Sequence, residues 1–301
     1  MEWRRWRKKV KNHLIYIAVA SFVKLLRTLP ESIAAKSMAA LGRLGFRLAK
    51  GERKKTTRHL QIALGSTKTP TEIQQLALRV FENLGSNGSA AIRTLKYLQQ
   101  GIDKRVHITG AEYLDAALAK GKGVLGITGH IGCWELMAAA LAKNGYPLAV
   151  VGKPLYDERL NRILVQQREK SGLINLSRDG AARRMMQWMR GGKMLGVLID
   201  QDTDVESEFV DVMGRQARTP IAPMLLAQRV GAAIVPMATY RQPDGRHVID
   251  IRPEIELVPD NGTRETRRAN LTLCSKAIEA FILEHPEQWV WMHERWKTPP
   301  A

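Results

Sequence analysis

The sequence predicts an α/β fold, with a mostly parallel central sheet flanked by helices and a helical N-terminal region before it. Three observations support this prediction. Residues 1–100 are rich in helix-forming apolar and basic residues, four short apolar runs typical of buried strands follow residue 120, and helical stretches separate those runs. Strands that alternate with helices indicate a largely parallel sheet covered on both faces.

The N-terminal segment, residues 1–30, is the most biased part of the chain. An uncharged run over residues 12–23 follows a cluster of basic residues in which Trp3 and Trp6 are interleaved. Those basic residues are Arg4, Arg5, Arg7, Lys8, Lys9 and Lys11. A spanning helix needs about 20 predominantly apolar residues, and this run is shorter. The pattern is typical of a membrane-associating segment and leaves open whether it spans the bilayer or lies at its surface.

Two other interpretations of this segment are weaker. A cleavable secretory signal would use Ala18-Val19-Ala20 as its cleavage site, but the amphipathic pattern continues through Lys24 and Arg27, so we expect the segment to be retained. An RNA-binding arm is disfavoured because no aromatic and basic platform follows it.

Residues 31–301 are predicted to form one α/β domain, helical over 31–100 and with an α/β core over 101–301. A first helix covers 31–50 and ends near Gly51. A second helix covers 69–84, and Thr69-Pro70-Thr71-Glu72 has the pattern of a helix start. In the core, we expect strands at 124–128, 148–151, 194–199 and 233–240. Residues 247–251 and 255–258, on either side of Pro253, predict an antiparallel pair at the sheet edge.

Composition limits the partners. The 301 residues include 47 basic and 29 acidic ones, a formal net charge of +18, so we expect anionic partners. The only cysteines, Cys133 and Cys274, lie far apart without metal-ligand spacing, which disfavours disulfides and a zinc site and favours a reducing compartment. We expect no metal, because nothing completes a ligand set around Asp200 and Asp202. We expect no nucleotide cofactor, because the glycines at 121, 123 and 126 precede and enter a strand instead of following it.

Polar residues follow two predicted strands, where reactive side chains of parallel sheets usually lie. His130 lies in the loop after 124–128, and Glu135 begins a predicted helix over 134–143. A carboxylate in a first helical turn is favoured by the helix dipole. It can bond one imidazole nitrogen and leave the other as a base. Taken alone, the pair is a weak signal, and a loop histidine satisfied by a local acceptor is the more common arrangement.

No nucleophile accompanies this pair. Cys133 is the nearest candidate, and a structural, buried cysteine is the better interpretation because no second base stands beside it. Without an enzyme nucleophile, the base has to activate a hydroxyl of the substrate itself. This indicates direct group transfer without a covalent intermediate on the enzyme.

The segment 129–136, Gly-His-Ile-Gly-Cys-Trp-Glu-Leu, resembles the first motif of the bacterial lipid A biosynthesis acyltransferases. These are the late lauroyl and myristoyl transferases of the lysophospholipid acyltransferase superfamily, whose motif is a histidine followed five residues later by an acid. Further matching blocks follow in order at 160–169, 200–202, 209–220 and 285–297. The family commonly has asparagine where Cys133 stands, and the glycerolipid branch favours aspartate at the position of Glu135.

The resemblance implies that His130 deprotonates an acceptor hydroxyl, Glu135 orients the imidazole, and the oxygen attacks an acyl thioester. It implies acyl carrier protein as donor, an anionic lipid A precursor as acceptor, no nucleic acid, and the cytoplasmic face of the inner membrane. Arg168 is expected to clamp a phosphate or to lie on a solvated helix face. Asp200 and Asp202 are expected in the substrate site. Trp289, Trp291 and Trp296 are expected to pack, rather than to surround a catalytic His293.

Three alternatives remain at this point. The chain is consistent with an acyl-CoA-dependent glycolipid or lysophospholipid acyltransferase, which differs in donor and acceptor. It is also consistent with a non-catalytic protein that binds membranes or nucleic acid, and with a thioesterase that hydrolyses the donor.

Overall fold

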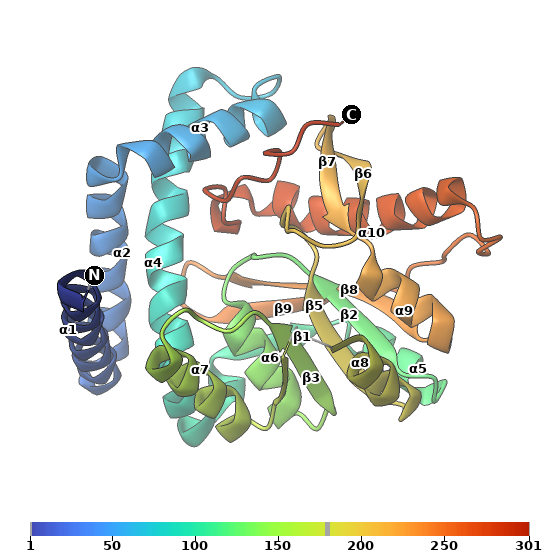
Figure 1. Cartoon of the computed structure of the whole chain (residues 1–301), viewed down its shortest axis with the longest axis horizontal. Coiled ribbons are helices and arrows are strands. Elements are labelled where there is room, and N and C mark those ends of the chain that lie inside the picture. The colour runs from blue at the N-terminus through green and yellow to red at the C-terminus, as the bar shows by residue number, and fades with distance from the viewer. Residues whose placement is uncertain (1, 178–180, 301) are drawn as a thin grey trace.

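The computed structural model describes residues 2–177 and 181–300 and contains a seven-stranded sheet with helices packed around it (Figure 1). The strand order is β1-β9-β8-β2-β5-β3-β4. In chain order these strands are β1 Val106–Thr109, β2 Val124–Thr128, β3 Leu148–Gly152, β4 Ile174–Ser177, β5 Met194–Leu198, β8 Ala233–Arg241 and β9 His247–Ile251. Strands β8, β2, β5, β3 and β4 run parallel. The predicted α/β fold with a mostly parallel sheet is confirmed.

The four predicted core strands occur as β2, β3, β5 and β8, but the prediction for 247–258 was partly wrong. Strand β9 is antiparallel to β8, not to residues 255–258, which form no strand. A tight turn closed by a hydrogen bond from Gln242 N to Arg246 O, 2.7 Å, brings β9 back beside β8. Strand β1 pairs with the other side of β9, so β9 is not an edge strand.

Two short strands and one hairpin were not predicted. Strands β1 and β4 have four residues each and include polar ones, so they lack the apolar runs that mark the other strands. Strands β6 Ser207–Val212 and β7 Arg215–Pro220 form a separate antiparallel pair. This β6–β7 hairpin projects beside helix α10 Arg264–Glu284 in Figure 1.

The N-terminal third of the chain is helical, as predicted. It consists of α1 Glu2–Thr28, α2 Glu31–Leu48, α3 Lys50–Leu64 and α4 Pro70–Gln100. A capping box between Thr69 and Glu72 starts α4 at its predicted position. The predicted end at 84 was too early, although glycine at 85 costs helix propensity. A Cβ on Gly85 would lie 2.1 Å from Met38 O, so glycine there lets α2 approach α4 closely.

The sheet separates two hydrophobic clusters, because alternate residues of its buried strands point to opposite faces. Leu125 and Ile127 of β2 pack with residues of α3, α8, α9 and α10, whereas Val124 packs with residues of α5 and α6. Residues of α4 contribute to both clusters. The remaining helices are α5 Ala111–Ala119, α6 Trp134–Lys143, α7 Glu158–Lys170, α8 Ala181–Arg190, α9 Ala222–Val230, and the short η1 Ile102–Lys104 and η2 Pro286–Gln288.

Helix α1 lies at the edge of the molecule (Figure 1), where it contacts α4 and α7. Much of its apolar surface faces outward, since the side chains of Leu14, Ile15, Ile17, Phe22 and Leu25 are exposed. Trp3 and Trp6 are also exposed and stack on each other with ring centroids 5.2 Å apart. Across residues 2–177 and 181–300, the helices are all too short or too polar to cross a bilayer.

Candidate active site

His130 lies in the loop that joins β2 to α6, at the carboxyl end of the parallel strands. Strand β2 pairs in register with β5, so that Thr128 is opposite Leu198, and Ile199 N donates to Thr128 O at 3.1 Å. The residues that leave these two neighbouring strands therefore meet at the same sheet edge. One strand supplies His130 and the other supplies Asp200.

The carboxylate of Asp200 holds His130 at two points. Asp200 Oδ1 lies 2.8 Å from His130 Nδ1, and Asp200 Oδ2 accepts from the backbone N of His130 at 2.6 Å. Trp289 Nε1 also donates to Oδ2, at 2.7 Å. Asp200 is almost fully buried, and its charge is compensated by these neighbours and by the nearby cation of Arg295. The arrangement sets the position of the loop and the orientation of the imidazole together.

The pKa shifts of the two groups support an ion-pair-like interaction. Burial lowers the pKa of His130, but the charge and hydrogen bond of Asp200 and the charge of Glu135 outweigh burial, and the pKa is raised above its ordinary value. Burial raises the pKa of Asp200, but His130 outweighs it and holds that pKa far below its usual range. Asp200 is thus ionised, and it makes the imidazole a stronger base.

The second imidazole nitrogen of His130, Nε2, faces the open side of the site. Its side chain is 23% exposed, whereas that of Asp200 is 3% exposed. Gln201 Nε2 lies 3.4 Å from His130 Nε2, and the Trp134 ring meets the imidazole edge-on at 4.9 Å. A hydroxyl that approaches the site can therefore reach Nε2, which has no strong partner within the described residues. Sequence reasoning did not single out Gln201, although the motif 200–202 contains it.

The predicted contact between Glu135 and His130 is corrected by the structure. Glu135 starts α6 as expected, but its carboxylate accepts two hydrogen bonds from Arg168, at 2.5 Å from NH2 and 3.0 Å from Nε. Arg168 NH1 donates to Asn175 Oδ1 at 2.7 Å. Both side chains of the pair are 15% exposed. Arg168, expected to clamp a phosphate or to face solvent, is instead paired at the site, and Glu135 affects His130 through its charge.

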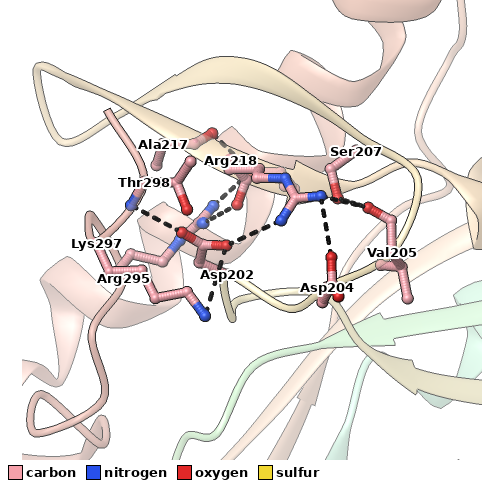
Figure 2. A network of polar contacts seen from close by, with 10 residues as sticks. Asp202, Asp204, Val205, Ser207, Ala217, Arg218, Arg295, Lys297 and Thr298 are labelled. Carbon is pink, nitrogen blue, oxygen red and sulfur yellow. Dashed lines mark hydrogen bonds and ion pairs between the residues drawn. The ribbon is translucent and has the colours of Figure 1, made fainter. Parts of the chain in front are cut away.

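Asp202 also differs from its predicted role. Its carboxylate lies inside a polar network formed with the β6–β7 hairpin and the C-terminal segment (Figure 2). Thr298 N donates to Asp202 Oδ2 at 3.1 Å, and the cations of Arg218 and Lys297 lie 3.7 and 4.0 Å from Oδ1. The Asp202 side chain has no exposed surface. It holds the loop after β5 in place, and it does not line the open side of the site.

The C-terminal segment fixes the His130 loop from the other side. Ile131 and Trp289 form an isolated antiparallel bridge, Gly132 N donates to Gln288 O at 2.9 Å, and Val290 N donates to His130 O at 3.1 Å. The tryptophans at 289, 291 and 296 are buried, as their predicted packing role requires. The bond from Trp289 to Asp200 was not predicted, because nothing local in the sequence connects residues so far apart.

His293 lies near the catalytic candidates, with its ring centroid 6.2 Å from that of His130. Burial lowers its pKa to about 4, so the ring is neutral at physiological pH. Neither ring nitrogen has a hydrogen-bond partner among the described residues. The sequence placed His293 in a packing segment, and the structure adds that it shares the environment of Asp200.

Cys133 has the properties expected of a structural cysteine. Its side chain is buried, and burial raises the pKa of the thiol to about 12. A thiol with that pKa is protonated and a poor nucleophile at neutral pH. In the described part of the chain, no three His, Cys, Asp or Glu side chains are grouped closely enough to bind a metal ion.

A small, mostly apolar cavity lies between α6 and the sheet, and Glu135 and Arg168 are among its lining residues. Its volume is about 40 Å³, and Met137, Leu141, Met194 and Met237 are among its lining residues. Methionine side chains are unbranched and flexible, so such a cavity can widen when an apolar ligand enters. The site thus places a histidine that is held by a carboxylate close to a small apolar cavity.

The sequence matches the family described as bacterial lipid A biosynthesis acyltransferase across residues 4–298. It is 26% identical over 282 residues to a lipid A biosynthesis acyltransferase of Haemophilus influenzae, covering 92% of this chain and 86% of that protein. It is 25% identical over 278 residues to the lipid A biosynthesis lauroyltransferase of Escherichia coli, covering 92% and 89%. A phosphatidylinositol mannoside acyltransferase of Mycolicibacterium smegmatis is 23% identical over 282 residues, covering 91% and 88%.

Proposed function

This chain belongs to the bacterial lipid A biosynthesis acyltransferase family, and on that premise we propose that it is a late acyltransferase of lipid A biosynthesis with His130 as the general base. The donor is the acyl thioester of acyl carrier protein, and the acceptor is a hydroxyl of a lipid A precursor. The observation that carries the proposal is the His130–Asp200 pair, 2.8 Å apart, at the carboxyl end of the central strands.

The chemistry follows from the free nitrogen of His130. Nε2 takes the proton of the acceptor hydroxyl while the hydroxyl oxygen attacks the carbonyl carbon of the thioester. A C–O bond forms, and a tetrahedral intermediate results. The intermediate collapses as the C–S bond breaks. The departing thiolate takes the proton back from the imidazolium, and ester and thiol are released with the histidine restored. A positioned base contributes about 10²–10⁴-fold to such a step.

Asp200 takes the role that the sequence assigned to Glu135. Its bond to Nδ1 selects the tautomer that leaves Nε2 unprotonated, and its charge stabilises the imidazolium that forms during attack. Glu135 contributes its charge and holds Arg168 by a bidentate pair. We propose that this pair forms the polar rim of the apolar cavity, where the thioester lies when the acyl chain enters between the methionines.

The electrostatics of the chain favour the proposed substrates. Acyl carrier protein and phosphorylated lipid precursors are acidic, and a net charge of +18 attracts both by long-range steering. The exposed apolar residues of α1 and its stacked tryptophans suit the headgroup region of a bilayer. We therefore place the protein at the cytoplasmic face of the inner membrane.

One comparison favours a second acceptor. The relative from Mycolicibacterium smegmatis acts, by its name, on phosphatidylinositol mannoside, and its identity to this chain is close to that of the lipid A enzymes. A glycolipid acceptor with an acyl-CoA donor is therefore the alternative. It would use the same base and the same cavity, and it would differ in which headgroup binds over His130.

The function is tested with the purified full chain. We expect transfer to a lipid A precursor from acyl carrier protein thioester and little from acyl-CoA, measured by mass spectrometry of the lipid product. His130→Ala should abolish transfer, and His107→Ala, at an exposed position on β1, should not. Transfer only to phosphatidylinositol mannoside would select the alternative acceptor. Hydrolysis of the thioester without acceptor, at the rate of transfer, would indicate a thioesterase.

A further inference from the structure

A second cavity, which we call the α1–α7 cavity, lies where helix α1 runs along helix α7. Its volume is about 310 Å³, much larger than the 40 Å³ of the cavity beside His130. Side-chain contacts at two points join the two helices. Arg159, near the start of α7, bonds His13 and Asn12 in the middle of α1, and Arg27, near the end of α1, bonds Gln167 of α7. The cavity lies between these two points of contact and also touches α4 through Leu95.

The charged residues that line the α1–α7 cavity are all cationic, and its neutral polar residues are Thr28, Gln166 and Gln167. Lys24, Arg27 and Lys170 line it, and its lining includes no carboxylate. Arg27 is held in place by bonds from Nε to Ile92 O, 3.1 Å, and from NH2 to Gln167 Oε1, 2.9 Å. Within residues 2–177 and 181–300, Lys24 and Lys170 have no acidic or hydrogen-bonding partner. Three cations with no counter-charge favour an anion, and two of them are free to bind it.

The other walls of the cavity are apolar. Ala20 and Val23 of α1 and Ile163 of α7 line it. On the outer face of α1, Phe22 and Leu25 are exposed beside these residues. A ligand that fits this cavity therefore combines a negatively charged group with adjacent hydrocarbon, and it approaches from the side of the molecule that presents apolar side chains. A bilayer phospholipid has this chemistry, whereas a free anion uses only the cations.

We propose that the α1–α7 cavity binds the headgroup phosphate of an anionic phospholipid of the membrane. The phosphate is held by Lys24, Lys170 and the fixed guanidinium of Arg27, and the glycerol and first methylenes pack on Ala20, Val23 and Ile163. The site is separate from the acyl-transfer residues, and its occupation ties α1 to α7. It docks the enzyme on anionic bilayers in a defined orientation, whichever acceptor the active site uses.

The test uses the full chain and sedimentation with phosphatidylcholine vesicles that contain or lack phosphatidylglycerol. Two variants attack the site in different ways. Ala20→Phe fills the cavity without a change of charge, and Lys24→Ser with Lys170→Ser removes the two free cations. We expect the double lysine variant to lower partitioning onto phosphatidylglycerol vesicles about thirtyfold, since each lysine near an anionic surface contributes about 1 kcal/mol. We expect Ala20→Phe to lower it as well, because the ring occupies the space of the headgroup. Binding to pure phosphatidylcholine should change little.

Matched controls separate the site from general effects. Ala18→Phe adds the same ring on the exposed face of α1, and Lys122→Ser with Lys143→Ser removes the same charge from exposed positions elsewhere. Both control variants should bind phosphatidylglycerol vesicles about as strongly as the parent protein, or more strongly. The cavity is not the binding site if Ala20→Phe binds the vesicles like the parent while the double variant at Lys24 and Lys170 does not. The same conclusion follows if the double variant at Lys122 and Lys143 loses as much binding as the one at Lys24 and Lys170.

Inorganic phosphate distinguishes the lipid from a free anion. At constant ionic strength, we expect phosphate in place of chloride to leave vesicle binding of the parent unchanged. Displacement of the protein by phosphate alone would assign the cavity to free phosphate and overturn the lipid assignment. His130→Ala should bind vesicles like the parent, so a failure of this inference is distinguishable from a failure of the proposed acyl transfer.

Discussion

At the scale of single residues, Asp200 is the main partner of His130, the proposed base. It bonds both the ring and the backbone of His130, and it raises the pKa of the imidazole. Because a general base must be deprotonated to act, activity falls as pH decreases through the pKa of His130. The acid limb of the pH profile therefore reports the Asp200–His130 interaction directly.

Asp200→Asn is predicted to lower kcat/KM by about 10²-fold or more, because the imidazolium loses its counter-charge and the tautomer is no longer selected. The pKa of His130 should fall, so the acid limb of the kcat/KM profile should move to lower pH. The measurement is kcat/KM for the thioester as a function of pH. Asp204→Asn, at a fully exposed carboxylate, is the control and should keep the parent profile. An unshifted acid limb in Asp200→Asn would contradict the assignment.

Glu135 acts through a partner rather than by direct contact, so its effects should depend on Arg168. The two side chains form a largely buried bidentate pair. We predict that Glu135→Gln and Arg168→Gln are not additive in the free energy of unfolding, with a coupling of about 0.5–3 kcal/mol in a double-mutant cycle. Urea denaturation of the four proteins measures it. Additive effects would mean that the pair does not stabilise the site.

At the scale of elements, the loop between β2 and α6 is held by its close fit against β8. Gly132 has a φ of +57°, and a Cβ there would lie 2.0 Å from Thr239 O. A side chain at this position is therefore both strained and obstructed by backbone. The loop bends sharply enough to bring His130 to Asp200 only because this residue is glycine.

Gly132→Ala is predicted to lower the free energy of unfolding by roughly 1–3 kcal/mol and to reduce activity, since the loop has to shift away from β8. Gly121→Ala is the matched control. Its φ is +69°, but no atom lies within 4 Å of the added Cβ, so it carries only the conformational cost. Urea denaturation and acyl transfer are measured for both. Equal losses in the two variants would show that close packing on Thr239 does not matter.

Helix α6 forms one wall of the apolar cavity, and Ala138 faces that cavity. Ala138→Phe is predicted to shift the donor preference toward shorter acyl chains, with about a tenfold loss in kcat/KM for the longest donor that the parent uses. Donors of increasing chain length are compared in competition. Ala116→Phe, at an exposed position on α5, should leave the preference unchanged. A uniform loss at every chain length would place the acyl chain elsewhere.

At the scale of the whole molecule, three histidines whose pKa values burial lowers, His59, His247 and His293, make the fold sensitive to acid. Burial, together with the charge of Arg241, lowers the pKa of His247 to about 4, and burial lowers that of His293 to about 4. A depressed pKa means that the folded state resists protonation. The contribution of each neutral histidine to the free energy of unfolding is fully present above the unfolded-state pKa of about 6.5. It is lost as pH falls toward the folded-state pKa, which is about 4 for His247 and His293.

We predict that the free energy of unfolding decreases between pH 6.5 and 4, by on the order of 3 kcal/mol for each of His247 and His293. His130 opposes this trend, because its raised pKa adds stability below the unfolded value. Urea midpoints across this pH range measure the slope. His247→Phe should flatten it, whereas His107→Phe, at an exposed position on β1, should not. The same slope in His247→Phe would assign the acid sensitivity to other groups.

The sequence by itself determined the fold class, the four central strands and the position of His130. These depend on local patterns: apolar runs long enough to be buried, a capping box at Thr69 and a loop histidine directly after a strand. Short strands such as β1 and β4, with few apolar residues, have no such local pattern and were missed. The end of α4 was also misplaced, because packing against α2 makes up for the helix propensity lost at Gly85.

Only the tertiary structure decided which carboxylate serves His130. Glu135 is five residues away along the chain, but α6 directs it to Arg168, whereas Asp200 is seventy residues away and is brought to the imidazole by the pairing of β2 with β5. The C-terminal segment contacts both aspartates after β5: Trp289 donates to Asp200, and the backbone of Thr298 donates to Asp202. The order of strands in a sheet is set by long-range packing, so spacing along the chain pointed to His130, the proposed base, but not to the carboxylate that bonds it.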